Sequence, residues 1–201
     1  MGFKGALLTG FVSRSSGTIN EHRMLRDGHS TRERFMDRVR RDAERILKAQ
    51  KKGYAYISAG QFDWLDLLRP LASAGGGFES RESGGEDAVG PVTRWYRTNT
   101  FYRKPHVHGA LSSDGREIAA AVPELGENAH GRGVVFLPGP YTFTRLVENS
   151  YYENPADLAA DYVLFLAANG AELQKRGYSA ALLSEPSVGY DFSLECFDEN
   201  R

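Results

Sequence analysis

The clearest pattern of apolar and polar positions lies within residues 134–191. A short apolar run at 134–137 ends at a Pro-Gly-Pro turn, apolar residues then recur at helical spacing over 156–175, and a second apolar run at 180–183 ends at Ser-Glu-Pro. This order predicts a β-α-β unit, in which the two strands run parallel and the loops after them collect on one face. α/β proteins bind ligands on that face.

Further apolar runs predict more strands of the same kind. Residues 6–10 and 54–58 are short apolar runs followed by glycine and polar residues, as in buried strands. Residues 30–52 carry apolar side chains on one stripe of an otherwise charged segment, which predicts a surface helix with Ser30 or Thr31 at its start. With a further strand at Trp95, five strands alternate mainly with helices, and the pattern predicts a parallel α/β fold.

The segments between these elements predict connections. Residues 13–20 predict a polar loop, 65–72 a short helix, 112–115 a turn, and 124–133 a polar connector. The segment 73–90 combines repeated glycines with charges, and we expect a flexible insertion there.

Composition and charge narrow the classes of partner. The chain has 201 residues, of which 41% are hydrophobic, so it is long enough to form one domain with a core. Because 25 basic residues nearly balance 26 acidic ones, charge gives no reason to expect a nucleic acid or an anionic membrane as partner. The apolar stretches are shorter than the about 20 residues that span a bilayer, and the amino terminus lacks a signal-peptide cleavage site. We therefore expect a cytoplasmic protein with a small-molecule ligand.

The segment 93–108 mixes aromatic and cationic side chains. Its sequence, TRWYRTNTFYRKPHVH, would suit a pocket for an anionic aromatic small molecule, an ordinary strand, or stacking against nucleic-acid bases. The balanced net charge favours the small-molecule pocket among these three interpretations.

Two histidines at the end of this segment raise the question of a metal. His106 and His108 point to the same side of an extended segment, where a carboxylate or His130 would complete a site. A histidine pair at a loop or strand edge is the alternative. The single cysteine, Cys196, forms no internal disulfide and cannot by itself supply a cysteine-rich zinc site. We expect no metal in this chain.

Five short motifs follow one another along the chain. They are Leu-Thr-Gly-Phe at 8–11 followed by Ser-Arg at 13–14, Ser-Ala-Gly-Gln-Phe-Asp-Trp at 58–64, Arg-Trp-Tyr-Arg-Thr-Asn-Thr-Phe-Tyr at 94–102 with Pro105 after it, Leu-Pro-Gly-Pro-Tyr-Thr at 137–142, and Leu-Ser-Glu-Pro-Ser at 183–187. In this order they resemble motifs of the cobalamin-independent methionine synthase family, in particular of its amino-terminal barrel. The resemblance extends over most of the chain.

The resemblance implies a fold and a chemistry. The fold is a (β/α)₈ barrel of the kind shared with uroporphyrinogen decarboxylase, so residues 1–201 would form a single barrel domain with only the first five β/α units, incomplete at the C-terminus. The chemistry is transfer of a methyl group from 5-methyltetrahydrofolate with a polyglutamate tail to homocysteine. In the family, zinc in a second barrel holds the homocysteine sulfur, and a zinc-bound thiol is deprotonated at neutral pH. This chain has no counterparts of those zinc ligands, so we expect no cofactor here.

The resemblance also implies candidate site residues. Arg94 stands where the family has a lysine that contacts the polyglutamate tail, and a guanidinium binds a carboxylate well. Glu185 is the candidate acid/base or ammonium-binding residue, with a structural ion pair as the alternative. His22, Arg23 and Arg26 are alternatives to Arg14 as the basic residue of the first loop. The other candidates for ligand binding are Arg14, Gln61, Asp63, Trp64, Trp95, Asn99 and Tyr102.

Three departures from the family's pattern limit the expected activity. Gly10-Phe11 stands where the catalytic barrel has a Gly-Ser turn for the homocysteine carboxylate. Gln61 stands where the catalytic barrel has a homocysteine-binding glutamate, and Ser184 stands where it has an aspartate. We therefore expect binding of a folate-type anionic ligand at the loops after the strands, without zinc-dependent methyl transfer by this chain alone. The alternatives are a noncatalytic scaffold barrel that partners a separate zinc-bearing barrel, or a uroporphyrinogen-decarboxylase-like enzyme. An open fifth strand would also favour association, with a catalytic barrel or as a homo-oligomer.

Overall fold

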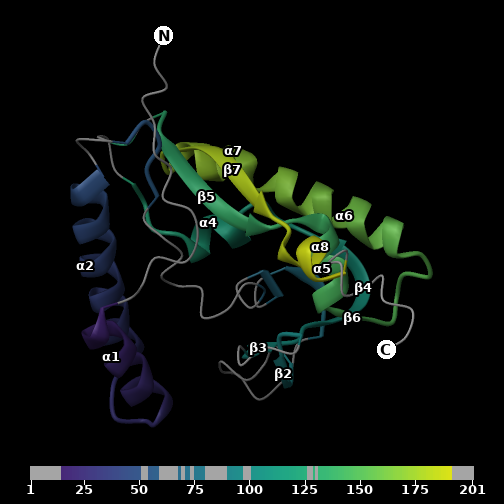
Figure 1. Ribbon diagram of the computed structural model, residues 1–201, viewed down its shortest axis with the longest axis horizontal. Coiled ribbons are helices and arrows are strands. Elements are labelled where there is room, and N and C mark those ends of the chain that lie inside the picture. Colours follow the sequence, from purple (N-terminus) through teal and green to yellow (C-terminus); the bar gives the residue numbers. More distant parts are fainter. Residues whose placement is uncertain are drawn as a thin grey trace. The chain divides into compact units, whose positions relative to one another are not determined.

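The chain is a mixed α/β protein in which short strands and helices interleave (Figure 1). This computed structural model describes residues 15–50, 54–58, 68, 71–72, 75–79, 90–96, 101–125, 129 and 131–191. The helices are α1 Ser16–Arg26, α2 Arg32–Gln50, α4 Glu117–Ala121, α5 Pro140–Leu146, α6 Pro155–Ala168, α7 Gly170–Lys175 and α8 Pro186–Asp191. The strands are β1 Gly76–Phe78, β2 Val92–Arg94, β3 Phe101–Arg103, β4 His106–Ser112, β5 Gly133–Pro138, β6 Glu148–Asn149 and β7 Tyr178–Ser184.

The strands form three small sheets. One has the order β1-β4-β6, the second is the antiparallel pair β2-β3, and the third is the pair β5-β7. Strand β4 pairs antiparallel with β1 and parallel with β6. The mixed α/β class is thus present, but within the described ranges the strands do not close into a barrel.

The chain divides into two compact units. The first unit comprises residues 1–64, 119–136 and 172–182, and the second comprises 65–118, 137–171 and 183–201. Strands β5 and β7 both run from the first unit into the second.

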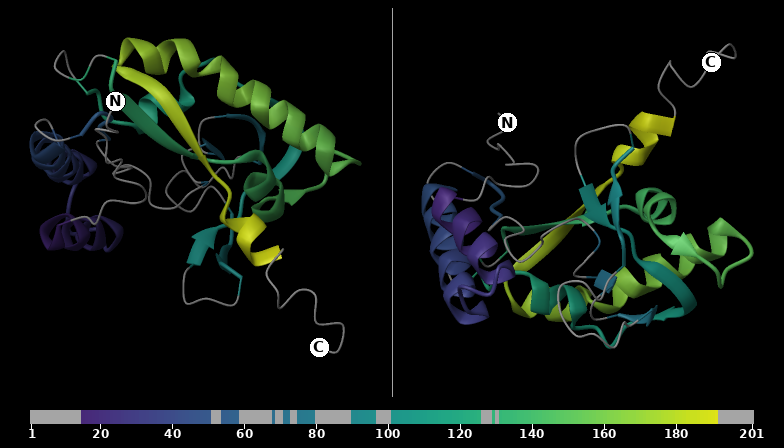
Figure 2. Two further views of the ribbon diagram at one scale, coloured as in Figure 1. Left: turned by 45° about the horizontal axis from the view of Figure 1, so that its top comes forward. Right: turned by 90° about the horizontal axis from the view of Figure 1, so that it is seen from below.

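The predicted β-α-β unit is present, with one break in its helix. Strand β5 covers the first apolar run and β7 the second, and they lie side by side (Figures 1 and 2). Gly139 N donates to Ser184 O at one end of the pair, and Ser179 Oγ donates to Gly133 O at the other. Because both contacts advance in the same direction along the two strands, the strands are parallel. The helix predicted over 156–175 is two helices, α6 and α7.

Asn169 lies at this break and is completely buried. Its Oδ1 accepts from Ile118 N at 2.9 Å, and its Nδ2 donates to Glu117 Oε2 at 3.1 Å and to Ser113 Oγ at 2.9 Å. A buried amide must find such partners, and these bonds connect the end of α6 to the start of α4.

Several other predictions are confirmed or corrected. The surface helix over 30–52 is α2, with Phe35, Val39 and Ile46 buried. The polar loop predicted over 13–20 is wrong, because Ser15 caps α1 by accepting from Thr18 N at 3.3 Å. The strand predicted at about Trp95 corresponds to β2, which ends at Arg94 and pairs antiparallel with β3, so the parallel arrangement predicted for it is wrong. Trp95 follows β2, and Tyr96 has a φ of 47°, a turn conformation.

The strands predicted over 54–58 and 6–10 have different outcomes. Of the segment 54–58, only Ile57 pairs, in a parallel bridge with Gly133. The strand predicted over 6–10 lies outside the described residues. The segment 73–90 includes β1, which pairs with β4.

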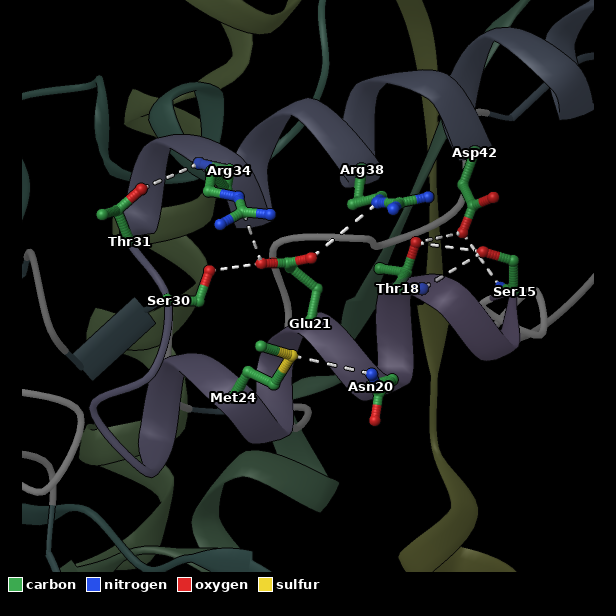
Figure 3. A network of polar contacts seen from close by, with 10 residues as sticks. All are labelled: Ser15, Thr18, Asn20, Glu21, Met24, Ser30, Thr31, Arg34, Arg38 and Asp42. Carbon is green, nitrogen blue, oxygen red and sulfur yellow. Dashed lines mark hydrogen bonds and ion pairs between the residues drawn. The ribbon is translucent and has the colours of Figure 1, made fainter.

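A polar network fixes α1 on α2 (Figure 3). Buried Asp42 accepts from Ser15 N at 2.9 Å and from Thr18 Oγ1 at 2.7 Å. Buried Glu21 accepts from the Ser30 hydroxyl, and Arg34 Nε and Arg38 Nε each lie 3.9 Å from it. Buried carboxylates cost free energy unless they are bonded in this way, so the network sets which faces of the two helices meet.

In the part of the chain that the structure describes, no helix is long and apolar enough to cross a membrane.

Candidate functional site

The carboxylate of Glu185 lies at the start of α5. Its Oε1 accepts from Tyr141 N at 3.0 Å and its Oε2 accepts from Thr142 N at 2.6 Å. The first amides of a helix have no partner within the helix, and this side chain supplies one from the end of β7. Gly139 makes the approach possible, since a Cβ on it would clash with the Glu185 carboxylate. Glu185 therefore joins β7 to α5.

A buried tyrosine lies next to this carboxylate. The Tyr162 hydroxyl donates to Pro138 O at 3.0 Å, and its ring stacks on Phe143 with the centroids 3.8 Å apart. Burial raises the pKa of Tyr162 well above its ordinary value, and the negative charge of Glu185 adds to this. Tyr162 is therefore a neutral hydrogen-bond donor that closes the end of β5.

Asp191, at the end of α8, binds two side chains of α5. It accepts from the Tyr141 hydroxyl at 2.8 Å and from Arg145 Nε at 2.7 Å. The hydrogen bond from Arg145 lowers the pKa of Asp191, and the hydrogen bond to Asp191 raises the pKa of Tyr141. These contacts hold α8 against α5 with an ionised carboxylate.

The aromatic residues of the β2–β3 hairpin reach the same two helices. Tyr96 stacks on Tyr190 of α8, with ring centroids 4.4 Å apart. The Trp95 ring makes edge contacts with the rings of Tyr96 and Tyr102, with centroid distances of 6.0 and 5.8 Å. The hydroxyl of Tyr102 donates to Leu146 O at the end of α5. The Tyr96 hydroxyl is buried and has no hydrogen-bond partner among the described residues.

The other face of this hairpin is exposed. Cross-strand pairs join Val92 to Arg103 and Arg94 to Phe101. Alternation along a strand places these four side chains on one face, opposite the buried Tyr102. Val92 is 58% and Phe101 is 54% exposed, and the guanidinium of Arg94 lies 5.6 Å from the centre of the Phe101 ring. We call this set, Val92, Arg94, Phe101 and Arg103, the exposed hairpin face.

The structure places some of the predicted site residues in one unit. Arg94, Trp95, Tyr102 and Glu185 all belong to the second unit, around α5 and the hairpin. Glu185 and Tyr102 bind backbone groups of α5, whereas Arg94 is exposed. The remaining candidates lie outside the described residues: Arg14, Gln61, Asp63, Trp64 and Asn99.

Sequence reasoning missed Tyr141, Arg145 and Asp191. Tyr141 and Arg145 are four residues apart, which places them on one side of a helix, and this spacing was the available signal. It was hidden because the Pro-Gly-Pro segment was interpreted as a turn, whereas Pro140 is the first residue of α5.

The described residues do not fit a zinc ion. Among them, no three His, Cys, Asp or Glu side chains are grouped so that they could hold a metal. His106 bonds Glu79 and Ser150, and its ring centre lies 6.2 Å from that of His108. His130 and Cys196 lie outside the described residues. No step of a mechanism is therefore assigned to a metal.

Comparison with known proteins gives a likeness of fold. No family model matches the chain, and no curated protein matches it in sequence. The crystal structure of a putative vitamin-B12-independent methionine synthase from Listeria monocytogenes matches with a TM-score of 0.64 and 17% identity, over 94% of this chain and 54% of that one. A B12-independent methionine synthase from Shewanella sp. W3-18-1, in complex with selenomethionine, matches with a TM-score of 0.55 and 16% identity, over 84% and 49%.

These matches concern architecture. The chain spans about half the length of the two solved structures. At 16–17% identity, what it shares with these methionine synthases is the fold of the part that it covers.

Proposed function

We propose that the chain is a methionine-synthase-like domain that binds an anionic aromatic ligand of the folate type. It would correspond to the first five units of a (β/α)₈ barrel. The observation that carries the proposal is Arg94, whose exposed guanidinium lies over the half-exposed ring of Phe101. The likeness of fold to two methionine synthases supports the methionine-synthase-like architecture in this proposal.

The chemistry of the exposed hairpin face matches such a ligand. A flat pterin ring stacks on an exposed aromatic side chain, and Phe101 offers one. A glutamate tail carries carboxylates, which guanidinium groups bind through paired, charge-assisted hydrogen bonds. The Arg94 guanidinium lies over the Phe101 ring, so one ligand could stack on the ring and place a carboxylate at the guanidinium.

Glu185 has a different part in this proposal. Both of its oxygens accept from amides of α5, so the carboxylate orders the α5 start. Its role as an acid/base or ammonium-binding residue stays a prediction. The proposal is accordingly one of binding, and it assigns no methyl transfer to this chain.

Calorimetric titration with 5-methyltetrahydrofolate triglutamate tests the proposal. We expect Arg94→Ala to weaken binding about 10- to 100-fold, because a hydrogen bond to a charged group contributes about 1.5–3 kcal/mol. Phe101→Ala should also weaken binding. Arg40→Ala is the matched control, since Arg40 is an exposed arginine that pairs with Asp37 on α2. Absence of binding at high micromolar ligand, or equal affinities for the Arg94 and Arg40 variants, would contradict it.

A scaffold role is the second candidate, and strand β7 favours it. Only Tyr178 of this strand is buried, and Leu182 and Leu183 are 37% and 47% exposed. Tyr178–Ser184 has no charged residue, and among the described residues its strand partner is β5 alone. An uncharged, exposed edge strand is a template for pairing with another chain.

The occupant we propose for this edge is a second copy of the chain. Two identical edge strands can pair antiparallel about a two-fold axis, and Tyr178–Ser184 carries no charge that would oppose such pairing. Light scattering should then give a native mass above 22.3 kDa that Leu182→Lys reduces. Leu164→Lys, at a 67% exposed position of α6, is the control. A monomeric mass for the unaltered protein would exclude this role.

A further inference from the structure

Three strands of one sheet bring a glutamate, a histidine and a serine together. Glu79 follows β1, His106 begins β4, and Ser150 follows β6. Glu79 N donates to His106 O at 2.9 Å, and Ser150 N donates to Val107 O at 3.0 Å. The backbone pairing of the sheet therefore fixes the order of the three residues across its edge.

Their side chains form a continuous hydrogen-bonded row. Ser150 Oγ lies 2.7 Å from His106 Nε2, and His106 Nδ1 lies 3.0 Å from Glu79 Oε2. A carboxylate only accepts, so the proton of the neutral imidazole is on Nδ1 and donates to Glu79. Nε2 can then accept from the hydroxyl of Ser150 at 2.7 Å, which is shorter than the 3.4 Å from the same hydroxyl to Val107 O. This is the order of nucleophile, base and orienting carboxylate that activates a serine.

We propose that Ser150, His106 and Glu79 form a nucleophilic triad that transfers acyl groups from small activated esters to Ser150. Nothing in the proposed folate binding uses these three residues. None of them is on the exposed hairpin face or in contact with Glu185, so the two proposals stand independently.

Acylation of Ser150 and hydrolysis of the acyl-serine need only the ester and water. Ser150 Oγ bonds to the carbonyl carbon of the ester while its proton passes to His106 Nε2. The carbon–oxygen bond to the alcohol then breaks, and the alcohol leaves with that proton. Water, deprotonated by His106, attacks the acyl-serine, releases the carboxylic acid and restores the hydroxyl.

The position of the triad sets the substrate class. The side chains of His106 and Glu79 are 29% and 48% exposed, and Tyr151 beside the serine is 52% exposed. Solvent therefore reaches the carbonyl oxygen of the ester, which becomes negative when Ser150 attacks. Water stabilises this negative charge less than preorganised hydrogen-bond donors would. We expect slow turnover, with esters that have a good leaving group and a small acyl part.

The test uses p-nitrophenyl acetate and the full chain. We expect a burst of p-nitrophenol and an acetyl group on the peptide that contains Ser150, found by mass spectrometry. Ser150→Ala should abolish both signals. His106→Gln should slow acylation about 100-fold, the usual contribution of a general base, and Glu79→Gln should slow it less.

His108→Gln is the matched control. It alters an exposed histidine two residues along the same strand, and it should leave the burst unchanged. Circular dichroism and thermal unfolding establish that each variant is folded. Ser150→Cys keeps a nucleophile at the site and should be acetylated on sulfur. This result would support nucleophilic attack from position 150 even if Ser150→Ala is unstable. Acetylation elsewhere in the chain, or equal rates for the His106 and His108 variants, would overturn the proposal.

Discussion

Strands β5 and β7 are neighbours in one sheet and each contains an apolar run, but they differ strongly in burial. All six residues of β5 are buried, whereas only Tyr178 of β7 is. Strand β5 has a partner on each side. One partner is β7 and the other is Ile57. The Ile57 amide donates to Arg132 O, and the Ile57 carbonyl accepts from Val134 N. Within the described residues, β7 is bonded only to β5. An apolar run thus predicts a strand, but its position in the sheet decides how much of it is buried.

The largest expected effect on stability comes from replacing one leucine in each strand. Leu137 of β5 is 2% exposed and Leu183 of β7 is 47% exposed. We expect Leu137→Ala to lower the free energy of unfolding by about 2–5 kcal/mol, because it leaves a cavity. Leu183→Ala should change it by at most about 0.5 kcal/mol in the monomer. Urea unfolding measures both, and a large loss for Leu183→Ala would show that β7 is covered in solution.

The second test compares the glycines that follow the two strands. A Cβ on Gly139 would meet the carboxylate of Glu185, whereas one on Gly189 would meet nothing within 4 Å. Gly139→Ala should cost about 1–3 kcal/mol, because Glu185 must leave the amides of α5. Gly189→Ala should stabilise α8 by up to about 1 kcal/mol.

A double-mutant cycle checks this mechanism. If displacement of Glu185 causes the loss, Gly139→Ala should cost little in a Glu185→Ala background. Equal costs in the two backgrounds would show that Gly139 acts through its backbone instead.

The third test removes one hydroxyl near each strand. Tyr162→Phe removes the buried donor to Pro138 O at the end of β5, and we expect a loss of about 1–2 kcal/mol. Ser179→Ala removes an exposed hydroxyl on β7 that lies 3.3 Å from Gly133 O, and we expect a change within about 0.5 kcal/mol. Thermal unfolding of both variants gives the comparison, and similar losses would contradict it.

The smallest effect concerns Glu117, which binds Asn169 on the connection between the strands. Burial raises the pKa of Glu117, but hydrogen bonds from the Ser113 hydroxyl, backbone amides and Asn169 outweigh this, so its pKa lies below the ordinary 4.5. Its contribution to stability is therefore complete above pH 4.5 and is lost as the pH falls through the lower pKa of the folded protein.

Glu117→Gln should remove that part of the acid dependence. The difference in urea midpoint between the unaltered protein and the variant should shrink as the pH falls below 4.5. A difference that stays constant across this range would contradict the assignment.

Local pattern was enough for some elements and not for others. The stripe of Phe35, Val39 and Ile46 predicted α2, and the apolar runs predicted β5 and β7. The short helices α5 and α8 were missed because Pro140 and Pro186 at their starts also begin turns.

The candidate site shows the same division. The sequence marked Glu185 as an acid after a strand and Arg94 as a cation among aromatic residues. It could not show that Glu185 would meet amides 43 and 44 residues away, or that Tyr102 would turn inward while Arg94 faces solvent. These outcomes depend on which strands pair, and pairing brings together residues that are distant in the chain.

The sequence by itself determined the class of the protein, the β-α-β unit over 134–191 and the charges available for a ligand, because helix and strand periodicity are local properties of the chain. Only the tertiary structure decided that β7 is exposed beside a buried β5, and that Glu79, His106 and Ser150 form one row. The reason is physical: burial and hydrogen bonding across strands are set by neighbours in space, and no local pattern encodes those neighbours.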